Sequence, residues 1–216
     1  MKKRPLVLAI CFGVMTLAAM AASKTPIFVS PNFKPELVDQ VSVFVVDPKN
    51  DVENNKECIG GAEYGTLSSG GAEPSLAKRG YGRHGRASLT RFYSATAVPT
   101  EALLANPTKE WLQELSNQKY LDPKGKDVLP PGRWIMFITI DELGSRENVV
   151  KGLGRATLSM YLYDRDEGTL LWHDQATREH VWNGLMGNVM SKGDAKRDAC
   201  ATLVFQMVMK MPKHKK

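Results

Sequence analysis

Two pairs of neighbouring histidine and carboxylate residues stand close together in the second half of the chain: His173-Asp174 and Glu179-His180. A histidine beside a carboxylate can act as a general base, so this segment is the best local candidate for hydrolytic chemistry. On a strand, residues an even number apart share a face, which puts Asp174 with His180 and His173 with Glu179. We keep an envelope hydrolase using Asp174 and His180 as an alternative function. The competing interpretation is that these are polar residues on an exposed stretch of a hairpin strand.

Other motifs for catalysis or cofactor binding do not occur. Unless the strand has a bulge, His173 and His180 point to opposite faces and cannot share a metal ion, so we expect no metal site. The glycine-rich segment 60–71 has no Gly-Lys-Ser/Thr ending, and Gly152-Leu153-Gly154 precedes a strand rather than a helix. No serine lies in a Gly-x-Ser-x-Gly elbow. The sequence therefore predicts no catalytic residue and no cofactor.

A basic segment is the best candidate for binding. Between Glu73 and Glu101 the chain has no acidic residue, while cations accumulate from residue 78 to residue 91. The binding candidates are Arg79, Arg83, Arg86 and Arg91. Aromatic residues interleave with them, so the segment could bind anionic lipid head groups, a cell-wall polymer or an acidic patch on another envelope protein. The alternative is a solvated surface loop.

The amino terminus has the layout of a secretory signal peptide. Lys2, Lys3 and Arg4 precede an apolar stretch over residues 6–22, and Ala19-Met20-Ala21 offers small residues before a cut after Ala21. The alternative is an uncleaved membrane anchor at the short end of the usual range. Cys11 lies inside the apolar core rather than after it, so we expect no lipid attachment.

Charge and composition exclude several classes. The chain of 216 residues has 29 Lys+Arg against 23 Asp+Glu, and is 43% hydrophobic, which fits one globular domain. Removal of residues 1–21 takes away three basic residues and no acid, which leaves 26 against 23 and a formal charge of +3. A domain that reads phosphates normally keeps a strong basic excess, so we expect no nucleic-acid partner.

Two cysteines, Cys58 and Cys200, remain after the leader. In an oxidising compartment they could form one disulfide, which the chain-entropy model values at roughly 4 kcal/mol for so long a loop. The alternative is two buried free thiols, because the sequence does not say whether the two Cα atoms come within reach.

These residues must be positioned by a mixture of strands and helices. Alternation of apolar and polar residues over 152–164, a turn at 164–168 and a returning strand over 169–181 indicate a β-hairpin. The full predicted order is a strand over 41–47, helical pieces over 52–67 and 74–78, a strand over 88–98, a helix over 106–118 opened by Asn106 and Pro107, strands over 133–141, 152–164 and 169–181, and a helix that Asp194 caps and Pro212 stops.

We therefore predict an α/β (α+β) fold with a single mixed sheet of about five strands and helices packed on it. The expected organisation is a signal peptide over 1–21, an extended lead-in over 22–38, one domain over 39–212 and a Lys-rich tail over 213–216.

The hairpin residues resemble those of a known group. Residues 156–164, the turn with Gly168, and Leu170-Leu171-Trp172 are similar to the "apolar strand, Asp, turn, Leu-Trp" hairpin of bacterial envelope proteins with the TolB amino-terminal-like fold, including the curli-secretion lipoprotein CsgG. The first strand, followed by Pro48 and Asn50, and the run 76–81 are also similar to that group. The resemblance implies a non-enzymatic envelope domain used in assembly or transport, and it transfers no catalytic residue.

Our expectation is therefore a secreted or periplasmic protein that binds other envelope components, through an exposed sheet edge or the basic segment. A carrier of an apolar ligand is a further alternative, for which a closed apolar cavity would be the sign. Partner and oligomeric state do not follow from the sequence.

Overall fold

A computed structural model describes residues 26–47, 52–65, 70–83, 100–117, 120–121, 127–128, 130–148, 151–183 and 192–214. Within these residues the molecule is an α+β fold built on one mixed sheet, which confirms the predicted fold class. The sheet has six strands in the order β1-β8-β7-β6-β2-β3, rather than about five, because two short edge strands join it. A second sheet holds only β4 (Tyr120–Leu121) and β5 (Asp127–Val128).

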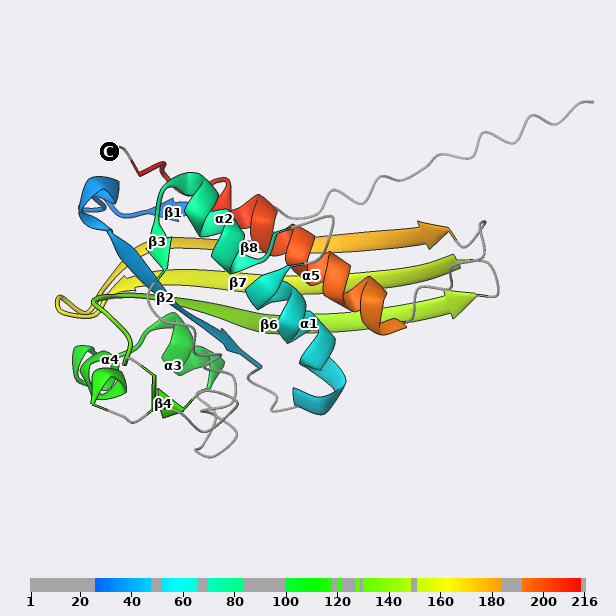
Figure 1. Cartoon of the computed structure of the whole chain (residues 1–216), viewed down its shortest axis with the longest axis horizontal. Coiled ribbons are helices and arrows are strands. Elements are labelled where there is room, and N and C mark those ends of the chain that lie inside the picture. Colours follow the sequence, from blue (N-terminus) through cyan, green and yellow to red (C-terminus); the bar gives the residue numbers. More distant parts are fainter. Residues whose placement is uncertain are drawn as a thin grey trace, which may run out of the picture.

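Three long strands form the middle of the main sheet (Figure 1). β6 (Trp134–Asn148), β7 (Lys151–Asp164) and β8 (Thr169–Asn183) make an antiparallel meander, as the period-two pattern predicts. β2 (Gln40–Val46) lies parallel to β6, and the short strand β3 (Gly82–Arg83) lies parallel to β2. At the other edge, β1 (Phe28–Val29) runs antiparallel to β8. The hairpin that carries the candidate histidines therefore forms one edge region of the sheet.

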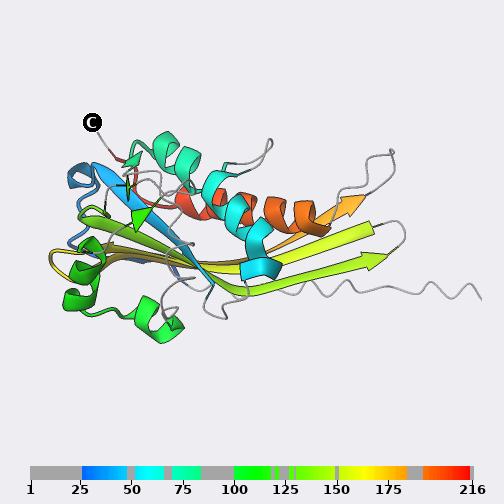
Figure 2. The same cartoon turned by 60° about the horizontal axis from the view of Figure 1, so that its bottom comes forward.

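Three helices cover one face of this sheet (Figure 2). They are α1 (Val52–Tyr64), α2 (Ala72–Arg79) and α5 (Lys192–Val208), and α5 packs on β7 and β8 while α1 packs on α5. The two helices approach closely at Gly61, where a Cβ atom would lie 2.2 Å from the carbonyl oxygen of Arg197. The core beneath them is mostly aliphatic and includes Val41, Val45, Met136, Ile138, Leu158, Met160, Leu203 and Val204, together with the aromatic Trp172.

A disulfide joins α1 to α5 inside this core. Cys58 and Cys200 are both fully buried, with their Cα atoms 5.3 Å apart. The sequence left open whether the two cysteines form a disulfide or remain free thiols, and in the structure they form the disulfide. The close crossing at Gly61 brings the two helices near enough for it, which gives a glycine inside a helix a packing reason.

Two short helices cover only one end of the opposite face (Figure 2). α3 (Glu101–Ala105) and α4 (Lys109–Ser116) pack over an aromatic cluster that includes Phe44, Phe137, Tyr161 and Tyr163. The predicted cap of the second helix is wrong. The hydroxyl of Thr108, not the side chain of Asn106, accepts from an N–H of the first turn, that of Trp111, at 3.2 Å.

Both ends of the domain differ from the prediction. The described part of the lead-in, 26–38, is not a tail, because β1 belongs to the sheet, the 3₁₀ helix η1 (Pro35–Leu37) follows it, and Phe33 and Val38 are buried. At the carboxyl end, the backbone N–H of His214 donates to the carbonyl of Arg79 at 3.1 Å, so the predicted Lys-rich tail is attached to α2 at this residue. α5 begins at Lys192, before Asp194, which is therefore not its cap.

Some predictions fall on residues that the structure does not describe: the signal peptide 1–21 and the strand over 88–98. Among the helices of the described ranges, none has the length and apolar character needed to cross a membrane.

Candidate functional site

Of the predicted hydrolytic pair, the structure describes the side chain of Asp174. Asp174 is 1% exposed, so the interpretation of an exposed polar residue is wrong for it. Its carboxylate lies 2.7 Å from Nζ of Lys210, just beyond the carboxyl end of α5, and this contact compensates the buried charge. The side chain of His180 lies outside the described residues. Asp174 therefore serves to attach α5 to β8.

His173 lies on the opposite face, as the strand spacing predicts. Its ring stacks on that of Tyr161, with centroids 4.5 Å apart. Burial lowers the pKa of His173, an effect that the nearby carboxylates of Asp174 and Asp141 only partly oppose. A neutral, stacked imidazole of this kind fits a packing role.

The candidate binding arginines have different positions. The guanidinium of Arg79 donates from Nη2 to the carbonyl oxygen of Met211, so this side chain fastens the chain that follows α5. Arg83 lies in β3, but its side chain is outside the described residues, as are Arg86 and Arg91 entirely. Binding by Arg83, Arg86 and Arg91 remains a prediction.

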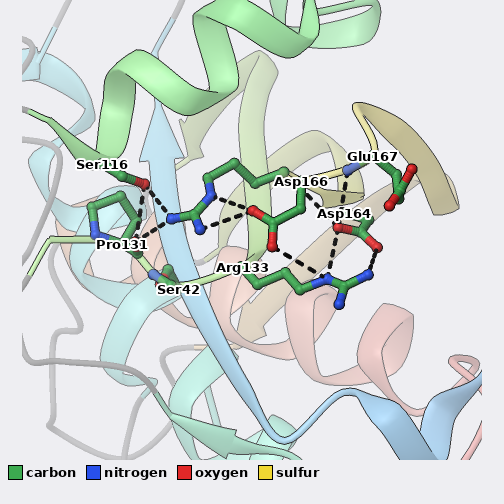
Figure 3. A network of polar contacts seen from close by, with 9 residues as sticks. Ser42, Ser116, Pro131, Arg133, Asp164, Asp166 and Glu167 are labelled. Carbon is green, nitrogen blue, oxygen red and sulfur yellow. Dashed lines mark hydrogen bonds and ion pairs between the residues drawn. The ribbon is translucent and has the colours of Figure 1, made fainter.

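The hairpin end of the sheet carries a dense polar network (Figure 3). The buried carboxylate of Asp164 accepts from Nε of Arg133 at 3.0 Å and from Nη2 at 2.6 Å, and also from the backbone N–H of Asp166 at 3.1 Å. The hydrogen bond to Asp164 raises the pKa of Arg133 above its ordinary value. The guanidinium carbon of Arg133 also lies 4.5 Å from the ring centroid of Trp134. These contacts fix the β7–β8 turn.

A second arginine ties the turn to α4. Arg165 donates to the carboxylate of Asp166, to the hydroxyl of Ser116 and to the carbonyl of Pro131 (Figure 3). The turn itself needs Gly168, whose φ of +67° disfavours residues with a Cβ. The sequence predicts the turn, but it contains no signal for the pairing of Arg133 with Asp164 across 31 positions.

A pocket of about 350 Å³ lies beside this network. Buried Trp134 and Leu171 contribute apolar surface to its lining. Lys34 and Leu37 come from the segment that follows β1. The other lining residues are Asn32, Arg133, Asp164, Glu167 and Thr169. Because the pocket is open and charged groups surround it, it does not match the closed apolar cavity expected of a carrier.

Exposed apolar side chains concentrate at β1 and η1, and one of them, Leu37, also lines the pocket. Among the described residues, the large apolar side chains that remain exposed are Ile27 (42%), Phe28 (43%), Val29 (45%), Leu37 (58%) and Tyr64 (48%). The first three lie at β1 and the fourth lies in η1, whereas Tyr64 ends α1. We call Ile27, Phe28, Val29 and Leu37 the apolar edge. An apolar sheet edge of this kind is typical of an interaction surface.

The three long strands carry a group of polar residues around one carboxylate, that of Asp141. At a β-bulge in β6, Asp141 accepts from Thr139 at 2.6 Å, from Ser159 at 2.5 Å and from Gln175 at 3.0 Å. Each donor comes from a different strand, so Asp141 binds the three strands together at the bulge. In the described part of the chain, no group of three histidine, cysteine or acidic residues could hold a metal ion.

No protein-family model and no curated protein matches this sequence. Solved structures do show similarity. A lipoprotein, GNA1162, from Neisseria meningitidis is 15% identical, with 70% of this chain and 88% of that chain covered and a TM-score of 0.41. The PelC dodecamer from Paraburkholderia phytofirmans is 11% identical over 88% of this chain and 97% of that chain, with a TM-score of 0.43. A minor lipoprotein from Acinetobacter baumannii is 9% identical over 81% and 92%, with a TM-score of 0.36.

The names of these three proteins indicate no enzymatic activity. Two of them are called lipoproteins, whereas Cys11 of this chain led us to expect no lipid attachment. The resemblance to TolB amino-terminal-like and CsgG-like domains is not confirmed by these matches. At such identities and scores the likeness carries no argument about function.

Proposed function

We propose that this chain is a non-enzymatic protein of the bacterial envelope that binds other envelope components during assembly or transport. The observation that carries the proposal is the apolar edge, because four of the five large apolar side chains left exposed in the described residues lie between residues 27 and 37, three of them consecutive at β1. A strand at the edge of a sheet offers unpaired backbone groups to a partner strand, and apolar side chains beside it add affinity.

Other features support this role. The predicted leader implies export, and the Cys58–Cys200 bridge fits an oxidising compartment. The carboxylate of Asp174, which the hydrolase alternative would use, is buried and paired with Lys210, an arrangement that favours a structural role.

Site-specific photo-crosslinking in cells tests the proposal. A photoreactive residue at Val29 or Leu37 should give covalent adducts with other envelope proteins. The same residue at Gln113, an exposed position on α4, is the matched control and should give few. Equal labelling at all three positions, or none at Val29 and Leu37, would remove the apolar edge as a binding surface.

The basic segment is a second surface within the same proposal. Charge reversal of Arg83, Arg86 and Arg91 together should reduce co-sedimentation with vesicles of anionic lipid or with cell-wall polymer. Arg79 is left unchanged, because its guanidinium holds the carbonyl of Met211 and its loss would disturb the fold. Unaltered co-sedimentation would restrict binding to the apolar edge.

A further inference from the structure

We propose that a second copy of this chain docks on β1, so that the two β1 strands pair antiparallel about Phe28. This inference rests on the proposed function, since it names one occupant of the apolar edge. It follows from the backbone directions at β1, from the side chains there and from the residues that flank the strand.

The backbone of β1 has one side already in use. Phe28 lies opposite His173 and Val29 opposite Trp172, and the N–H of Ser30 donates to the carbonyl of Leu171 at 2.8 Å. In an antiparallel strand the N–H and C=O of one residue point to the same side, and that side alternates along the chain. Phe28 and Ser30 therefore face β8, while Ile27 and Val29 direct their backbone groups away from the sheet. In the described part of the chain no strand lies beyond β1.

This arrangement is complementary to itself. If two copies pair antiparallel about Phe28, Ile27 of one copy lies opposite Val29 of the other, and the reverse holds across the two-fold axis. Each of these pairs exchanges two backbone hydrogen bonds, which uses the outward groups of both residues. Phe28 then lies opposite its own copy as a non-hydrogen-bonded pair, where side chains come closest. Cross-strand aromatic pairs at such positions are favourable.

The flanking residues permit this pairing and limit it. From Pro26 to Asn32 the chain has no charged residue, so two copies do not repel each other there. Pro26 and Pro31 stand at the two ends of the strand, and proline cannot extend a ladder of hydrogen bonds. The pairing is therefore confined to the few residues between them, and we expect a reversible dimer rather than a growing sheet.

The edge is also held in place before a partner arrives. The N–H of Phe33 donates to the carbonyl of Ser30 at 3.0 Å, and the N–H of Asn32 donates to the hydroxyl of Ser30 at 3.2 Å. The side chain of Phe33 is buried in the core. Because the turn after β1 is already ordered, docking costs less conformational entropy than pairing with a flexible tail would.

A charge-swap experiment tests this register. The full chain, expressed with its own amino terminus, is examined by sedimentation equilibrium over a concentration series. We expect a concentration-dependent dimer, with Phe28→Asp and Phe28→Lys each weakening association at least tenfold by placing like charges opposite each other. A mixture of the two variants should recover association as a heterodimer, because residue 28 meets residue 28 only in this pairing.

Tyr64→Asp is the matched control, since Tyr64 is as exposed as Phe28 but lies at the end of α1, and it should leave the dimer unchanged. A monomer at every concentration, or a dimer that Phe28→Asp does not weaken, would overturn the inference. So would failure of the mixed variants to associate when each remains folded by circular dichroism. Crosslinks from Val29 to other proteins in a chain that stays monomeric would leave the proposed function in place and remove only the second copy.

Discussion

Asp164 is the residue on which the hairpin end of the sheet depends. Asp164 is 4% exposed, and its carboxylate accepts from Nε and Nη2 of Arg133 as well as from backbone N–H groups of the turn. Asp164→Asn removes the charge that these donors face. We expect a loss of about 1–3 kcal/mol in the free energy of unfolding, measured by urea denaturation.

Asp166→Asn is the control for this change, because Asp166 also meets Arg133 but its side chain is 44% exposed. An exposed ion pair contributes less than about 1 kcal/mol. If both variants lose the same stability, the buried network does not have the importance that we assign to it.

The burial of His173 leads us to expect that the free energy of unfolding depends on pH. Burial lowers its pKa in the folded protein, so the unfolded chain binds a proton more readily than the folded chain does. Stability should therefore fall as the pH drops below the ordinary pKa of histidine, about 6.5, and continue to fall until the pH passes the folded value. His173→Phe keeps the stacking on Tyr161 and should flatten this part of the curve. The measurement is the urea midpoint between pH 7.5 and pH 5; an unchanged slope would contradict the assignment.

Among the elements, α4 is the helix at which the cap expected from the sequence can be compared directly with the cap in the structure. Asn-Pro at 106–107 predicts a helix opened by Asn106, whereas the hydroxyl of Thr108 accepts from the N–H of Trp111. Thr108→Ala should cost about 1 kcal/mol of stability in thermal or urea unfolding. Asn106→Ala should cost much less stability. If Asn106→Ala proved to be the more costly of the two, Asn106 would be the cap, as the sequence predicts.

The disulfide between α1 and α5 is the other element to test. It joins residues 142 positions apart, and the chain-entropy model gives roughly 4–5 kcal/mol for such a loop. The double variant Cys58→Ala, Cys200→Ala should lose stability of this order, and its unfolding should no longer respond to reductant. A wild-type chain whose urea midpoint does not change with reductant would show that the bridge contributes little.

The strands could be predicted from the sequence better than their pairing and better than the helix boundaries. Alternation over 152–164 reflects a strand with two different faces, and these faces are the ones that meet α5 and the aromatic cluster. β1 was missed because a strand of two residues leaves too short a pattern, and its pairing with β8 is a tertiary contact. α1 could be placed only approximately, since Gly60 and Gly61 oppose a helix until packing on α5 is known.

The candidate site was predicted less well, for a physical reason. Asp174 looks like a polar residue on a strand, and only the position of Lys210 after α5 makes it a buried ion pair. The pairing of Arg133 with Asp164 likewise depends on the register between β6 and β7. Residues 84–99, where the basic segment continues, lie outside the described structure, so Arg86 and Arg91 remain at the level of the sequence prediction.

At the scale of the whole molecule, the last described residues of the chain lie against the start of the basic segment. Tyr81, directly before β3, donates its hydroxyl to the carbonyl of Pro212, and its ring meets that of His214 edge-on at 5.8 Å. Burial raises the pKa of Tyr81 to about 12, so the phenol stays a neutral donor at physiological pH. The residues after α5 thus hold α2 and β3 in place, and we call this set of contacts the clasp.

Deletion of residues 212–216 should open this clasp. The buried hydroxyl of Tyr81 would lose its acceptor, and we expect a loss of about 1–3 kcal/mol in urea unfolding together with faster amide exchange at Gly80–Gly82. Deletion of 215–216 alone is the control and should leave both measurements unchanged. Tyr81→Phe should cost stability in the full chain but little more in the chain that lacks 212–216, because the two changes remove the same contact. If the two losses simply add, Tyr81 and Pro212 do not act together, and the residues after α5 do not hold the start of the basic segment.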